Sequence, residues 1–259
     1  MTEKNVAKKP DNTVGFPIDL EADAGRGYEN VEHDDMVVPF LRIAQALSPE
    51  VDETAPEHIN GIKQGMLYNT ATKQIWEGGK GIGFVPAVFK RQYLEFIPRD
   101  KGGGFQGEHG PEIMDQTQRG ENNADVLMNG NEILIAGTWF GILYDMENKV
   151  PVGQVVVSMV KTQLKYSRQL MTRLRNIQLD GKNGRFNPPL FWNLLSIKTM
   201  PEKNDFGRWF SFDVEPTGSI LDMPMGEQVY LEAKKLADLV NTGQKRADTH
   251  QAVDEEVPF

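Results

Sequence analysis

Residues 133–175 constrain the fold most, because two runs with the composition of strands lead directly into a basic amphipathic helix. The first run, 133–144 (ILIAGTWFGILY), is rich in β-branched and aromatic residues, and the second, 150–160 (VPVGQVVVSMV), is rich in valine. The intervening DMENK is typical of a turn. The two runs therefore predict a β-hairpin.

Beyond this hairpin the apolar residues recur at helical spacing. One stripe consists of Val160, Leu164, Met171 and Leu174, with Ser167 filling the one gap. It predicts a helix that buries one face. Another face of the same helix is cationic and polar, and it carries Lys161, Lys165, Arg168, Thr172 and Arg175.

Positive charge is concentrated in this part of the chain. Residues 160–185 carry seven Lys and Arg against Asp180 alone, a local net charge of +6 in a protein whose net charge is −9. The negative charge belongs to the ends, since residues 1–35 contribute −5 and residues 248–259 contribute −4. A row of cations is commonly just a solvated helix face. Its concentration here favours a patch that attracts a polyanion.

Composition and motifs exclude several classes of protein. The absence of cysteine excludes disulfides, thiolate metal sites and a cysteine nucleophile, and it suits a reducing cytoplasm. No run reaches transmembrane length, and the polar N-terminus lacks the apolar core of a signal peptide, so we expect no membrane partner. There is no phosphate-binding loop, the four histidines lack ligand spacing, and the carboxylates form no nuclease motif. We therefore expect a protein that is not an enzyme and needs no cofactor or metal, with a metal-dependent nuclease built from distant acids as an alternative.

The chain divides by composition into three parts. Residues 1–35 predict a disordered N-terminal arm, 36–240 the folded domain, and 241–259 a flexible linker with an acidic tail. Within the domain, the polar stretch 99–130 predicts a long loop insertion able to close over a ligand.

The domain begins with a short packed segment. Residues 37–47 have apolar side chains at helical spacing, and 61–76 predict a strand pair with a turn at 69–73. Residues 81–98 predict a long strand whose alternation breaks near its middle, which indicates a bend or bulge.

The later elements complete a recognisable order. Residues 190–199 and 206–214 predict two more strands, and 225–240 predict a second amphipathic helix. The order of strand, long loop, strand, turn, strand, helix, strand, turn, strand is that of the OB-fold, a five-stranded barrel with a helix between strands 3 and 4. The predicted fold class is thus mainly β with α (α+β), an OB-fold-like barrel with flexible termini.

Cations and aromatic residues alternate along residues 90–99, as in proteins that bind single strands, where cations contact phosphates and rings stack on bases. An ordinary amphipathic strand has a similar pattern. The residues expected to bind DNA are Lys90, Arg91, Tyr93, Phe96, Arg99, Trp139, Lys161, Lys165, Arg168, Arg175, Lys182, Arg185, Trp192 and Trp209.

The C-terminal residues form a separate candidate site. A terminal Phe ring can enter an apolar pocket, its α-carboxylate can meet an arginine, and the acidic cluster can lie on a basic rim. A solubilising tail would explain the charges but not a Pro-Phe at the very end. The expected partner-binding residues are Asp254, Glu255, Glu256, Val257, Pro258 and Phe259.

The sequence DEEVPF resembles the tail of bacterial single-stranded-DNA-binding proteins, which recruits replication and repair enzymes. Together with the OB-like order and the acidic charge, the whole chain resembles the single-stranded-DNA-binding proteins of tailed bacteriophages. The stretches VPFLRIAQALSPEV and GMLYNTATKQIW are also similar to that group. The long N-terminal region, the large loop and the second helix depart from the bacterial protein, which leaves homo-oligomer formation open.

The resemblance implies a function in the host cell cytoplasm. The protein would bind single-stranded DNA without sequence preference, and would protect and organise it in phage DNA replication or recombination. Its tail would recruit replication or recombination proteins such as a polymerase, a helicase or primase, or a nuclease. The alternative is an adaptor or transcription regulator that acts on a host enzyme through the tail.

Overall fold

The computed structural model describes residues 22–31, 38–120, 124–205 and 207–247. The chain divides into two units, Met1–Met36 and Val37–Phe259. In the first unit, residues 22–31 form successive turns, with the Tyr28 amide donating to the Gly25 carbonyl. The second unit holds every regular element described below.

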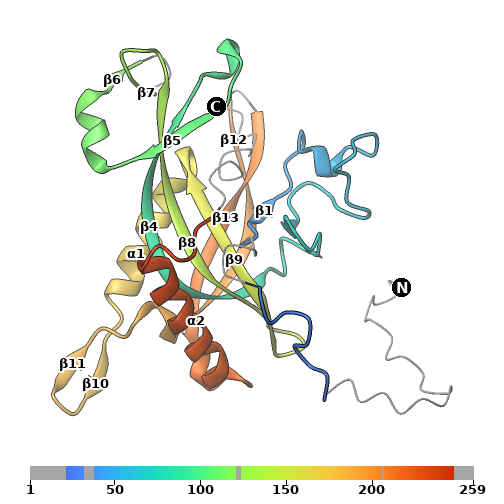
Figure 1. Ribbon diagram of the computed structural model, residues 1–259, viewed down its shortest axis with the longest axis vertical. Coiled ribbons are helices and arrows are strands. Elements are labelled where there is room, and N and C mark those ends of the chain that lie inside the picture. Colours follow the sequence, from blue (N-terminus) through green and yellow to red (C-terminus); the bar gives the residue numbers. More distant parts are fainter. Residues whose placement is uncertain (1–21, 32–37, 121–123, 206, 248–259) are drawn as a thin grey trace. The chain divides into compact units, whose positions relative to one another are not determined.

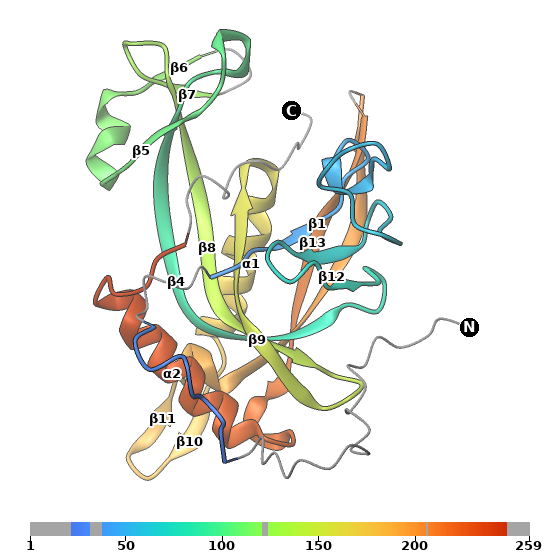
Figure 2. The same ribbon diagram turned by 45° about the vertical axis from the view of Figure 1, so that its right-hand side comes forward.

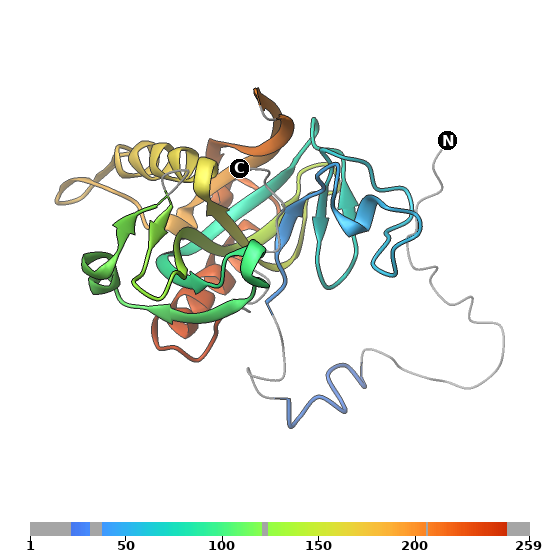
Figure 3. The same ribbon diagram turned by 90° about the horizontal axis from the view of Figure 1, so that it is seen from above.

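Five long antiparallel strands form the centre of the second unit (Figure 1). They lie in the order β9-β8-β4-β12-β13. The helix α1 follows β9 and precedes β12 along the chain. The bounds are β4 Ile82–Phe96, β8 Glu132–Asp145, β9 Val150–Val160, β12 Asn193–Asn204 and β13 Gly207–Ser219. All five match strands predicted from sequence, and the fold is mainly β with few helices, a strongly curled sheet that forms a half-barrel (Figure 3).

The sheet is curled at a bulge in its longest strand. The register between β4 and β8 shifts between Pro86 and Val88, as the broken alternation predicted. Phe84 before the bulge and Phe89 after it therefore face the same side, although they are an odd number of residues apart.

The two faces of the curled sheet pack on different helices (Figure 2). The helix α1 (Leu164–Arg175) contributes Leu170 and Leu174 to a core that contains Phe84 and Phe212. The helix α2 (Gly226–Asn241) contributes Val229, Ala233, Leu236, Ala237 and Val240 to a core on the other face, which contains Phe140 and Tyr144. Because α1 belongs to the concave face, its exposed residues lie beside the hollow of the half-barrel.

The region 99–130 contains regular structure, which corrects the prediction of a loop. Its short strands are β5 (Phe105–His109), which pairs with β4, β6 (Gln118–Arg119) and β7 (Asp125–Val126), which pairs with β8. Two 3-10 turns, Arg99–Lys101 and Pro111–Gln116, connect them. These strands extend the β4–β8 pair beyond the half-barrel.

The first packed segment is a strand, so the helix suggested by the spacing in residues 37–47 is wrong. Strand β1 (Leu41–Ile43) pairs with β2 (Leu67–Asn69), which pairs with β3 (Ile75–Trp76). All three residues of β1 are buried, whereas Leu47 is 72% exposed, so the buried residues are consecutive and not spaced along a helix face. The segment touches both outer long strands, since Phe40 forms a parallel bridge with Val156 of β9 and Gln45 binds the backbone of Phe210 in β13.

Candidate nucleic-acid interface

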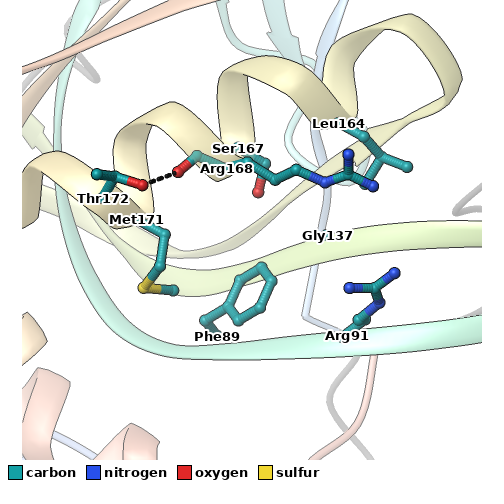
Figure 4. A pocket seen from close by; sticks show the side chains of 8 residues that line it. All are labelled: Phe89, Arg91, Gly137, Leu164, Ser167, Arg168, Met171 and Thr172. Carbon is teal, nitrogen blue, oxygen red and sulfur yellow. Dashed lines mark hydrogen bonds between the residues drawn. The ribbon is translucent and has the colours of Figure 1, made fainter. Parts of the chain in front are cut away.

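A pocket of about 310 Å³ opens between α1 and the concave side of β4 and β8. Helix α1 supplies one wall, and the strands supply the other (Figure 4). The pocket is apolar within and carries two arginines. Its lining residues are Phe89, Arg91, Gly137, Leu164, Ser167, Arg168, Met171 and Thr172.

Trp139 supports the pocket from inside the core. Its indole N–H donates a hydrogen bond of 2.9 Å to Ser167 Oγ, which joins β8 to α1. Its ring lies 4.8 Å from the ring of Phe89, centroid to centroid, in a tilted arrangement. Gly137 allows the helix to approach, because a Cβ there would lie 2.7 Å from Ser167 Oγ. The pocket wall is thus held in place before any ligand arrives.

Arg91 and Arg168 bring two guanidinium groups to the pocket, one from a strand and one from the helix (Figure 4). Both residues are exposed, and no ion pair to either occurs in the described part of the chain. The Arg91 guanidinium lies 5.5 Å from the centre of the Tyr93 ring, on the same face of β4. Free guanidinium groups beside exposed aromatic surface can bind phosphate and a base together.

The other cations predicted on α1 differ in how free they are. Lys161 and Arg175 are exposed. Lys165 Nζ lies 3.3 Å from Glu202 Oε2, and the Tyr166 hydroxyl and this carboxylate raise the pKa of Lys165. The Tyr166 hydroxyl also donates to Glu202 Oε1 at 2.7 Å. Lys165 would therefore have to exchange partners to contact a phosphate, at little cost for so exposed a pair.

The predicted loop at residues 181–189 begins as a hairpin arm. Strands β10 (Leu179–Gly181) and β11 (Gly184–Phe186) pair with each other, and the arm stands out from the sheet (Figure 1). Lys182 and Arg185 are exposed on it, and Arg185 Nε lies 3.3 Å from Asp180 Oδ1. The structure does not bring these two residues into the pocket.

Three predicted contacts in β4 and the turn after it do not line the pocket. Lys90 alternates with Arg91, so it faces the opposite side of the sheet. Phe96 packs against the core on that opposite side, where its ring lies 5.4 Å from the ring of Phe105. Arg99 lies in the 3-10 turn Arg99–Lys101.

The tryptophans need correction as base-stacking residues. Trp139 is 1% exposed and Trp209 is 6% exposed, so neither presents a ring face to a ligand. The concave and convex faces of the sheet are both covered, and a strand buried on both faces gives no sequence signal for an outward ring. Trp192 is half-buried in the turn Leu190–Trp192, and it does not line the pocket.

Sequence reasoning did not select Phe89 or Met171, which form the apolar part of the pocket. Phe89 belongs to the same alternating set as Arg91 and Tyr93, which was a usable signal. Met171 was assigned to the buried stripe of the helix, but it is half-buried at the pocket wall while Leu170 occupies the core. The partner-binding residues 254–259 lie outside the described residues.

Two general findings apply to the described ranges. No group of three or more His, Asp or Glu side chains there is arranged to hold a metal ion. None of the helices is long and apolar enough to cross a lipid bilayer.

Comparison with known proteins places the chain in a phage family. No curated protein and no solved structure matches it. A family model described as Pam3 phage gp34-like protein matches residues 8–246. The chain belongs to this family of phage proteins.

Proposed function

We propose that this member of the Pam3 phage gp34-like family binds single-stranded DNA without sequence preference, and that it does so without catalysis. In this role it would protect and organise the strand during phage DNA replication or recombination in the host cytoplasm. The observation that carries the proposal is the pair of unpaired guanidinium groups, Arg91 and Arg168, beside the aromatic wall of the concave pocket. Phosphates and bases are the ligand groups that match these two kinds of surface.

The strand order supports an OB-fold interpretation of the half-barrel. Numbered along the chain, the long strands β4, β8, β9, β12 and β13 have the neighbours 3-2-1-4-5, and α1 lies between the third and fourth. This is the order expected for an OB-fold, a common fold for oligonucleotide binding. The described ladders include no pairing of β9 with β13, and the segment from Phe40 to Gln45 contacts both of them instead. We therefore infer an OB-like barrel closed by its N-terminal segment.

The charge distribution supports a path that continues along α1. Lys161 and Arg175 are exposed near the two ends of the helix, and Arg168 lies between them at the pocket. A helix of this length spans about 18 Å, enough to follow several phosphates. Lys165 would join this path after leaving Glu202.

Fluorescence anisotropy of a labelled poly-dT oligonucleotide tests the proposal. The titration is repeated at several salt concentrations, with an unlabelled duplex of equal length as competitor. We expect tight binding that weakens steeply with salt and that duplex does not displace. Absence of binding at low salt would overturn the proposal. Incubation of end-labelled DNA with Mg²⁺ or Mn²⁺ checks the expectation that no cleavage occurs.

The tail sequence favours a second candidate, an adaptor or transcription regulator that acts on a host enzyme through residues 254–259. Deletion of these six residues separates the two candidates. A protein that coats DNA keeps or gains DNA affinity, because an acidic segment has been removed. In the coating proposal the same deletion abolishes only the recruitment of replication or recombination proteins. An adaptor would lose its activity altogether.

A further inference from the structure

We propose that the pocket between α1 and β4 takes one unstacked base of the bound strand, with the adjoining phosphate held by Arg91 and Arg168. The ligand of the site is thus a nucleotide unit, not a phosphate alone. This inference rests on the proposed function and adds a specific seat to it. The seat lies beside the helix, apart from the outer surface of β8 and β9.

The size and lining of the pocket fit one nucleotide. Its volume of about 310 Å³ is at the lower end of the range for small-ligand sites, about 300–1,000 Å³. The side chains of Phe89, Leu164 and Met171 offer a ring, a branched chain and a thioether to a flat apolar surface. The two guanidinium groups lie to one side of the Phe89 ring, which leaves the ring accessible from the pocket (Figure 4).

The aromatic wall is positioned before binding. Phe89 packs against Trp139, and Trp139 is fixed to the helix through Ser167. A ring that is already ordered loses little conformational freedom when a base packs on it. The seat is therefore expected to be occupied without movement of α1.

The polar groups of the pocket indicate tolerance toward all four bases. Ser167 Oγ already accepts the indole N–H, and the Thr172 hydroxyl donates to the Arg168 carbonyl at 3.0 Å. The groups left to contact a base are mainly apolar, and apolar stacking does not distinguish base edges. A site of this kind suits a protein without sequence preference.

Methyl NMR of the full-length protein labelled at its methionine methyl groups tests the seat directly. The chain has 11 methionines, and a Met171→Leu variant identifies the Met171 signal. The probes are dTMP and 2-deoxyribose 5-phosphate, which share the sugar phosphate and differ in the base. We expect millimolar dTMP to shift the Met171 signal while 2-deoxyribose 5-phosphate does not. The signal of Met128, which is 97% exposed, serves as the control and should not move.

The outcomes separate this inference from the proposed function. If neither probe moves Met171, or if both move it equally, the base seat is wrong, whatever the oligonucleotide assay shows. If dTMP moves Met171 but no oligonucleotide binds, the seat stands and strand coating is wrong. A Phe89→Leu variant should also weaken oligonucleotide binding about tenfold, the loss typical of one stacked base. Met128→Ala should leave that affinity unchanged.

Discussion

The indole N–H of Trp139 donates to Ser167 Oγ at 2.9 Å, and this bond joins the centre of the sheet to the helix that carries the cations. Trp139 is 1% exposed and Ser167 is 2% exposed, so neither group can turn to water if its partner is lost. The orientation of the cationic helix thus depends on a buried polar contact.

Replacement of either partner should destabilise the fold. We expect Ser167→Ala to lower the free energy of unfolding by about 1–3 kcal/mol, because it leaves the buried indole N–H without an acceptor. The double variant Trp139→Phe/Ser167→Ala should lose less than the sum of the two single variants, since it removes both members of the pair. Urea unfolding of the four proteins measures the coupling. Strict additivity would show that the contact contributes nothing.

Gly137→Ala should move α1 away from the sheet. The new Cβ would lie 2.7 Å from Ser167 Oγ and 3.4 Å from Phe89 Cε2, too close to the first of these atoms. We expect a loss of about 1–3 kcal/mol in unfolding free energy, as for other overpacked sites. Gly107→Ala is the matched control in strand β5, because no atom lies within 4 Å of its added Cβ. Equal effects of the two substitutions would contradict the steric explanation.

Gln45→Ala should loosen the segment that contacts β9 and β13. The Gln45 amide Nε2 donates to the Phe210 carbonyl at 2.8 Å, and its Oε1 accepts from the Phe210 amide at 2.9 Å. The substitution leaves two backbone groups without partners, for an expected loss of about 1–3 kcal/mol by urea unfolding. Gln169→Ala, at an exposed site on α1, should change stability by less than about 0.5 kcal/mol.

Glu95 should make stability depend on pH in the acid range. Its carboxylate accepts hydrogen bonds from Asn131 at 2.6 Å and Asn129 at 3.3 Å, and it pairs with His109 at 2.7 Å. The Asn131 bond is the main cause of its lowered pKa, with His109 and Asn129 adding to it against the opposing effect of burial. Because the folded pKa is below the unfolded value of 4.5, the stabilisation is present above that value and is lost as the pH falls through the folded pKa.

Glu95→Gln removes this titration. We expect the variant to lose less stability than the wild type between pH 5 and pH 3, measured as the urea midpoint at each pH. The exposed Glu53→Gln substitution is the control and should follow the wild-type curve. A Glu95→Gln curve parallel to the wild type would mean that this cluster does not contribute to acid sensitivity.

The long elements could be predicted from sequence because each is periodic over many residues. Strands β4, β8, β9, β12 and β13 and both helices occur where the patterns placed them. Strand β1 has only three residues, so its apolar run could not be distinguished from a helical turn. The pocket was also hidden, because the curl of the sheet brings Phe89 and Met171 together from distant segments. Burial of Trp139 and Trp209 depends on which elements cover each face, which no local pattern records.

Charge-removing substitutions at the pocket should change the salt dependence of DNA binding in a countable way. For single strands, log K falls with log salt by about 0.7 for each phosphate contact. If Arg91 and Arg168 each hold a phosphate, the variant Arg91→Gln/Arg168→Gln should lower this slope by about 1.4, with the largest loss of affinity at low salt. Lys234→Gln removes one charge from the exposed face of α2, away from the pocket, and should leave the slope unchanged. If the control lowers the slope by as much per charge, the effect comes from the net charge of the protein and not from contacts at the pocket.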